Sequence, residues 1–237
     1  GQVIEAVHGK PWEAAIRERI LNPLQMGTTT TTSDLPTGAN RAWPHGRTSG
    51  AIRGLGPIRP LAAPTLLDNA APAGALNTSG AEIARWLEVQ LGRGLDPRTN
   101  VRLFSEAQAR EMWTPQTLIP VATNPKPLAL AQANFRAYTL GCSMSDYPGH
   151  AVVAHGGGVP GLVTMFAILP KQDVALAILT NAEESGALGA IQYRLLDHYL
   201  GLESPDWATA FVETHDARLA RARDQLAAAV QEKESTK

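Results

Sequence analysis

The sequence has a single cysteine, little charge and no long hydrophobic run. Its one cysteine, Cys142, excludes an internal disulfide and a cysteine-rich zinc site. Charged residues make up 18% of the chain, and 21 basic against 22 acidic side chains leave a formal net charge of −1. This balance gives no electrostatic case for nucleic acid or an anionic membrane surface as a partner. Because no run approaches about 18 consecutive apolar residues, no transmembrane helix is expected.

Motifs for metals and nucleotides are also missing. None of the six histidines forms a His-x-x-x-His or His-Glu-x-x-His pair, so the sequence predicts no metal site. The phosphate-binding pattern Gly-x-x-x-x-Gly-Lys followed by Ser or Thr does not occur. We therefore expect neither a metal nor a cofactor.

What is present indicates a well-cored protein with many turns. Hydrophobic residues make up 44% of the 237 residues, alongside 21 glycines and 17 prolines. At roughly 150 residues per domain, this length allows one or two compact units. We expect a helical and loop region over 1–134, strands and a helix of the same fold over 135–205, and a helical tail over 206–237.

Apolar residues recur at helical spacing in the first and last parts of the chain. Trp12, Ile16 and Ile20, for example, share one face of a predicted helix. Ser79 is suited to cap the N-terminus of another helix. The predicted helices cover residues 1–8, 11–21, 79–92, 105–114, 186–200 and 206–232. Between them, residues 27–65 are expected to form a long ordered loop rather than a flexible linker, because disordered segments are poor in aromatic residues such as Trp43.

From residue 135 to residue 180 the pattern changes to short apolar runs. The predicted strands cover residues 138–144, 151–155, 161–169 and 174–180. Their spacers, which include 156–160, have hairpin length, so the strands are expected to be consecutive and antiparallel. Helices and loops, then strands, then helices indicate the α+β class rather than alternating strands and helices.

His155 stands at the end of a predicted strand and is followed by Gly156-Gly157-Gly158. Glycines allow a backbone to approach a ligand closely, with N–H groups free to donate. An imidazole beside such donors suits a site where an oxyanion develops. The alternative interpretation is a simple turn, because glycine is common wherever the chain reverses. The other five histidines are interpreted as surface or loop residues.

Four segments form a recognisable combination. They are Gly9-Lys10-Pro11-Trp12 with Ile20-Leu21-Asn22-Pro23-Leu24-Gln25-Met26, Pro72-Ala73-Gly74 with Asn77-Thr78-Ser79, His155-Gly156-Gly157, and Leu179-Thr180-Asn181. Together they resemble the serine β-lactamase and penicillin-binding-protein-like hydrolases, in the branch of class C β-lactamases, D-aminopeptidases and esterases. Gln25 stands where that family usually has glycine, and His155 begins the segment that is similar to its Lys-Thr-Gly motif or His-x-Gly variant.

The resemblance implies a β-lactamase/transpeptidase-like fold and an acyl-enzyme formed on serine. In that family's terms, His155 would bind a substrate carboxylate or shuttle a proton, Gly158 would donate its N–H to the oxyanion, and Gly157 would permit close approach. Because imidazole is mostly neutral near pH 7, it holds a carboxylate less firmly than lysine does. The expected substrates are therefore small esters, amides or peptides rather than β-lactams turned over efficiently. A periplasmic or secreted location is favoured by the resemblance alone.

Two motifs of that family are absent. No serine stands three residues before any of the five lysines, so Ser-x-x-Lys is missing, and no tyrosine or serine has asparagine two residues later. We expect the N-terminal part with the nucleophile to lie outside this sequence, upstream or retained as a separate chain, and this chain alone to be inactive. The alternative is a catalytically inactive protein of the same fold that acts as a binding or interaction module.

A nucleophile within the chain is a weaker hypothesis. Ser143, Ser145 and Asp146 precede His155 by one turn, which makes a Ser–His pair conceivable. No Gly-x-Ser-x-Gly pattern supports it. Cys142 lies in an apolar run and is expected to be a small buried hydrophobe rather than a nucleophile.

Overall fold

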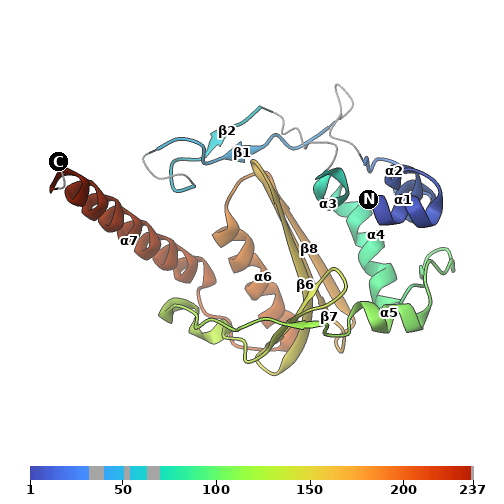
Figure 1. Ribbon diagram of the computed structural model, residues 1–237. Helices are drawn as coiled ribbons and strands as arrows, with labels where there is room; N and C mark the ends of the chain where they lie inside the picture. Colours follow the sequence, from blue (N-terminus) through green and yellow to red (C-terminus); the bar gives the residue numbers. More distant parts are fainter. Residues whose placement is uncertain (32–39, 51–53, 63–69, 236–237) are drawn as a thin grey trace.

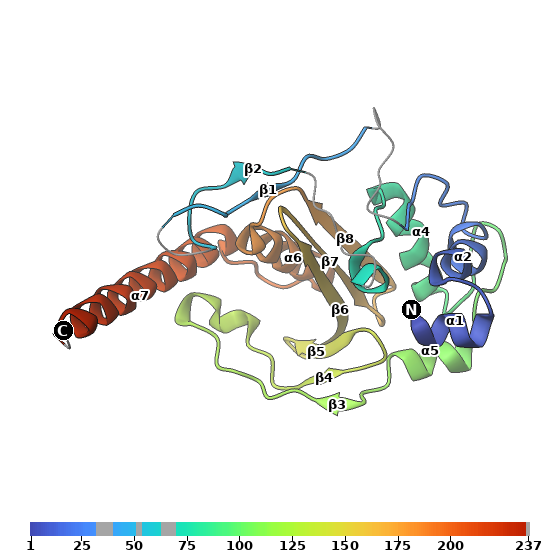
Figure 2. The ribbon, with the colours of Figure 1, turned by 45° about the horizontal axis from the view of Figure 1, so that its top comes forward.

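The computed structural model describes residues 1–31, 40–50, 54–62 and 70–235. A six-stranded antiparallel sheet lies at its centre, with α6 and α7 on one face and a helical layer that contains α4 on the other (Figures 1 and 2). The strands follow one another in the order of the sequence: β3 Thr117–Leu118, β4 Arg136–Tyr138, β5 Ser143–Tyr147, β6 His150–Val159, β7 Leu162–Leu169 and β8 Val174–Thr180. This confirms the predicted α+β class and its consecutive antiparallel strands.

The six predicted helices are present within a few residues at each end, and two short helical segments, α3 Ala71–Gly74 and the 3-10 segment η3 Lys126–Ala131, are not among those predicted. The predicted ones are α1 Gln2–His8, α2 Trp12–Ile16 with the π-helical turn η1 Arg17–Leu21, α4 Gly80–Leu91, α5 Glu106–Met112, α6 Ser185–Leu200 and α7 Trp207–Ser235. The Ser79 hydroxyl accepts the N–H of Glu82 at the start of α4, and Ser105 with Gln108 forms a capping box on α5. Local side-chain chemistry therefore determines where these two helices begin.

Successive residues of the central strands pack to opposite faces of the sheet. Val152 of β6 belongs to a core shared with α6 and α7, to which Leu196 and Trp207 contribute. On the other face, Val153 of β6 and its partner Ile168 of β7 are fully buried together with Leu87 of α4. The sheet is thus covered on both faces around Val152 and Val153. Residues of odd number on β6 face the helical layer.

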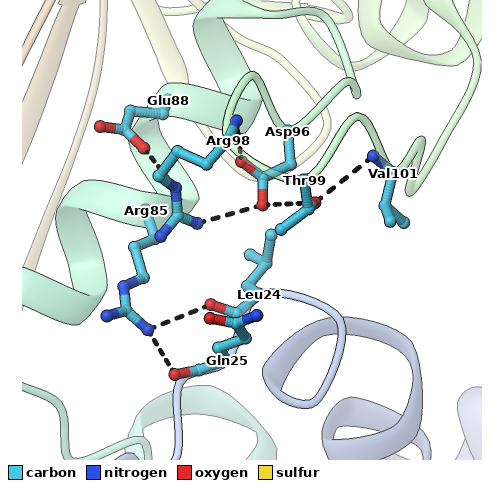
Figure 3. Close-up of polar contacts among 8 residues, drawn as sticks. All are labelled: Leu24, Gln25, Arg85, Glu88, Asp96, Arg98, Thr99 and Val101. Atoms are coloured by element: carbon cyan, nitrogen blue, oxygen red, sulfur yellow. Dashed lines mark hydrogen bonds and ion pairs between the residues drawn. The ribbon is translucent and has the colours of Figure 1, made fainter.

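Polar contacts tie the helical layer together (Figure 3). Arg85 of α4 donates to the backbone oxygens of Leu24 and Gln25, which follow η1. Asp96, with no exposed surface, accepts from the Arg98 guanidinium at 3.1 Å. Gln25 has a φ of 56°, a conformation that favours glycine, which explains why the resembling family usually has glycine there.

Two strand boundaries were predicted wrongly. The run 138–144 is not one strand: β4 ends at Tyr138, the chain turns through Gly141 at φ 96°, and β5 starts at Ser143. The spacer 156–160 is not a turn either, because β6 continues through all three glycines to Val159. A tight turn at Pro160 and Gly161 then leads into β7. Glycine composition alone misled the second assignment.

The segments expected to be irregular hold some short regular elements. Within 27–65, β1 His45–Gly46 pairs with β2 Arg59–Pro60, while residues 32–39, 51–53 and 63–65 lie outside the described part of the chain. Residues 116–135, for which the sequence predicts no helix or strand, contain β3 and η3. At the other end, α7 starts in the core at Trp207 and then projects from the body (Figure 1), with Val230 49% exposed.

Candidate active site

The glycine-rich half of β6 lies at an open edge within the sheet. β5 pairs with β6 only as far as the Ser143–Ala154 pair, whereas β7 accompanies β6 to the Val159–Leu162 pair. Within the described residues, positions 155–159 of β6 therefore have a strand neighbour on one side only. His155 and the three glycines are exposed there.

The direction of the backbone groups along this edge follows from two hydrogen bonds. The carbonyl of Ala154 accepts the Ser143 hydroxyl at 3.0 Å, so the backbone groups of Ala154 face β5. On β7, the carbonyl of Val163 accepts the hydroxyl of Thr180 of β8. Since an antiparallel strand turns successive residues to alternate sides, Gly157 faces β7, and the N–H of Gly158 points to the open edge.

The glycines leave this edge bare, although the backbone does not require glycine. None of the three has a positive φ. A Cβ on Gly156 or Gly158 would find its nearest neighbour at 3.6 or 3.7 Å, an ordinary contact distance, and one on Gly157 would lie 3.0 Å from Thr164 Oγ1. Neither conformation nor packing explains Gly156 and Gly158, so the feature they provide is accessible backbone.

His155 lies beside this bare strip and contacts a residue that the sequence analysis did not single out. Its Nε2 is 3.1 Å from the Tyr138 hydroxyl, and the two rings meet edge to face with centroids 6.2 Å apart. Tyr138 belongs to β4, two strands away. No local signal in the sequence could have indicated this contact, since it depends on the register of two hairpins.

The turn that follows the glycines is held by a loop distant in sequence. Glu183 accepts the N–H of Gly161 at 2.9 Å with one carboxylate oxygen and the N–H of Arg47 at 3.0 Å with the other. The carbonyl of Gly161 accepts the N–H of His45 at 3.0 Å. These bonds connect the β6–β7 turn, the loop around β1 and the chain after β8, and they fix the end of the candidate site.

Of the residues in the hypothesis of a nucleophile within the chain, Asp146 and Ser143 form hydrogen bonds with groups other than His155. Burial disfavours the charge of Asp146, but hydrogen bonds from Asn134 and Phe135 outweigh that effect and lower the pKa of this carboxyl. The Ser143 hydroxyl donates to a backbone carbonyl rather than to His155. Burial raises the pKa of the Cys142 thiol, as in a packed apolar residue.

In the part of the chain that the structure describes, no group of three or more His, Cys, Asp or Glu side chains is arranged to hold a metal ion. No helix in the same residues is both long and apolar enough to cross a membrane.

Comparison with solved structures finds several proteins with this fold. A penicillin-binding protein homologue from Pyrococcus abyssi, described as octameric, gives a TM-score of 0.63 at 21% identity over 86% of this chain and 41% of its own. A D-amino acid amidase from Ochrobactrum anthropi SV3, solved with D-phenylalanine, gives a TM-score of 0.56 at 19% identity. The match covers 90% of this chain and 55% of the amidase. A class C β-lactamase from Rhodobacter sphaeroides gives a TM-score of 0.54 at 13% identity, over 90% of this chain and 56% of the β-lactamase.

These relatives are considerably longer than the chain, which spans 41% to 56% of their length. No curated protein matches the sequence. The sequence model of the β-lactamase family, however, matches residues 1–228, nearly the whole chain. The chain therefore belongs to the β-lactamase family.

Proposed function

We propose that this chain carries the substrate-binding edge and one oxyanion donor of a serine hydrolase that cleaves small esters or amides through an acyl-enzyme. The observation that carries the proposal is the bare half of β6, where exposed glycines and His155 adjoin an edge with no strand partner among the described residues. Such an edge can receive an extended substrate by main-chain hydrogen bonds.

Each residue at the edge has a distinct part in this proposal. The Gly158 N–H donates to the oxygen that becomes negative when the carbonyl is attacked, a type of contact worth about 3–4 kcal/mol in other hydrolases. Gly157, without a side chain, lets the substrate lie flat on the strand. His155 binds the polar end of the substrate or passes a proton to the leaving group.

The nucleophile is proposed to come from a segment outside this sequence, in the same polypeptide or bound as a separate chain. The absence of Ser-x-x-Lys and the partial coverage of the relatives support this. The state of α1 supports it too: no residue of this helix is buried, and Val3 and Val7 are 76% and 84% exposed. Without that segment, we expect the chain to be inactive.

Amides and esters are favoured over β-lactams as substrates. Position 155 holds histidine where the resembling family often has lysine, and an imidazole generally attracts a carboxylate less than an ammonium group does. The relatives include a D-amino acid amidase solved with L-phenylalanine amide and a D-stereospecific amidohydrolase, which supports amides of small amino acids as the first class to test.

The test uses the full-length protein, with any residues encoded before Gly1. We expect it to hydrolyse p-nitrophenyl esters or amino-acid amides, and a fluorophosphonate probe to label one serine. His155→Ala should lower kcat/KM, whereas the matched change His198→Ala, on α6, should not. Absence of labelling in a folded protein that contains Ser-x-x-Lys would overturn the proposal, and an unchanged kcat/KM in His155→Ala would remove His155 from the site.

A second candidate is a catalytically inactive binding protein with the same fold. Its support is that both motifs of the family's catalytic residues are absent from the sequence. The reading frame upstream of Gly1 separates the two candidates. A gene that starts at or near Gly1, with an intact mass that shows no second chain, favours the binding protein.

A further inference from the structure

Tyr138 and His155 form a hydrogen bond at the surface, next to the bare half of β6. The hydroxyl and Nε2 are 3.1 Å apart, and Tyr138 is 41% exposed. β5, which lies between the two strands, begins only at Ser143, so the tyrosine reaches the imidazole beyond the first residue of that strand. An exposed hydrogen bond adds little to the free energy of unfolding, which makes orientation of the ring its main consequence.

The direction of this hydrogen bond and the position of the imidazole proton depend on each other. A neutral imidazole has one N–H donor and one acceptor nitrogen, and the phenol hydroxyl is a good donor. If the hydroxyl donates to Nε2, the imidazole proton must sit on Nδ1. The partner of one ring nitrogen thereby sets the role of the other.

We infer that Tyr138 is a positioning residue for His155: it holds the imidazole as the Nδ1–H tautomer and fixes the ring beside the glycine edge. This inference rests on the proposed function, because it gives His155 a defined donor for substrate. Tyr138 itself acts through the imidazole and needs no contact with the reacting atoms.

The chain offers a matched control in a second exposed tyrosine–histidine pair. Tyr199 is 49% exposed, and its ring meets that of His198 edge to face with centroids 5.1 Å apart. Both residues lie on α6, outside the candidate site. Loss of the Tyr199 hydroxyl therefore removes a surface phenol of similar exposure without touching His155.

The first measurement is spectroscopic and requires no activity. The ¹⁵N shifts of the His155 ring in the full-length protein, assigned by their loss in His155→Gln, should indicate the Nδ1–H tautomer at pH above the imidazole titration. In Tyr138→Phe they should move toward the Nε2–H form that free imidazole side chains prefer in water. Tyr199→Phe should leave them unchanged. Identical shifts in wild type and Tyr138→Phe would overturn the inference.

The second measurement is kinetic. Tyr138→Phe should lower kcat/KM roughly 5- to 10-fold, the loss expected for one neutral hydrogen bond, while Tyr199→Phe has no effect. Full activity in Tyr138→Phe would overturn the positioning role even if the tautomer moves. A wild-type protein with the expected tautomer and no hydrolysis of esters or amides would instead contradict the proposed function, so the two failures are distinguishable.

Discussion

The two halves of β6 differ in every respect that bears on ligand binding. Residues 150–154 all pair with β5, and Val153 and Ala154 also pair with β7 on the other side. Val152 and Val153 are buried on opposite faces. Residues 155–159 pair with β7 but with no second strand in the described residues, and glycine occupies three of these five positions. The first half contributes to the core, and the second offers backbone donors along three residues without side chains. A rigid strand thus presents an accessible edge, which is the arrangement that precise binding requires.

The largest expected effect concerns the buried half. Ile168→Ala, opposite Val153, should lower the free energy of unfolding by about 2–5 kcal/mol, because it leaves a cavity between the sheet and α4. Urea denaturation followed by circular dichroism measures this change. A loss below about 1 kcal/mol would mean that this half of the strand is not part of a packed core.

The next effect concerns the exposed half. Two variants of Gly158 distinguish the contribution of its N–H group from the contribution of its missing side chain. Gly158→Pro removes the N–H and should reduce kcat of the full-length protein by about 10²- to 10³-fold, with little loss of stability at an open edge. Gly158→Ala keeps the N–H, and its Cβ would lie 3.7 Å from Val163, so it should retain most of the activity. Equal activity in the two variants would contradict the donor role.

The turn between β6 and β7, at the end of the exposed half, can be tested for its contact with the loop around β1. Gly161 has a φ of 81° and an added Cβ would lie 2.6 Å from Pro44, whereas Gly149, at φ 78°, has open space around it. Gly149→Ala should cost about 1–2 kcal/mol of stability from conformation alone. Gly161→Ala should cost about 1–3 kcal/mol more, because it also displaces the loop around β1. Equal melting temperatures would mean that the loop does not hold the turn.

The smallest effect is expected at Gly156. Its φ is not positive, and an added Cβ would meet nothing closer than 3.6 Å. Gly156→Ala should therefore leave stability unchanged or raise it by up to about 1 kcal/mol, since alanine restricts the unfolded chain. A destabilisation above that size, measured by urea denaturation, would show that the glycines serve the fold rather than a ligand.

Features fixed by neighbouring residues were predictable from the sequence. Ser79 and Ser105 each cap a helix through a bond to a residue three positions later, so the pattern of a few residues sufficed. The antiparallel sheet was also predictable, because short apolar runs separated by hairpin-length spacers are a local pattern. The glycine run was misassigned as a turn, because single-strand composition does not reveal that β7 supplies a partner for each glycine.

Features that depend on distant contacts were not predictable. The sequence singles out His155 and its glycines as candidates, whereas the contact between Tyr138 and His155 depends on the registers of β4, β5 and β6. The same holds for Glu183, which joins two segments more than a hundred residues apart. These contacts arise from tertiary packing, which local patterns do not encode.

The most direct test of the central claim is the amide resonance of Gly158 during binding of a boronic acid. Such a compound forms a tetrahedral adduct with a catalytic serine and places an oxygen where the oxyanion develops. In the full-length protein, we expect a downfield shift of the Gly158 amide proton on addition of phenylboronic acid, with the buried Val153 amide unchanged. An adduct that forms on serine without any shift along residues 155–159 would show that this edge does not bind the oxyanion.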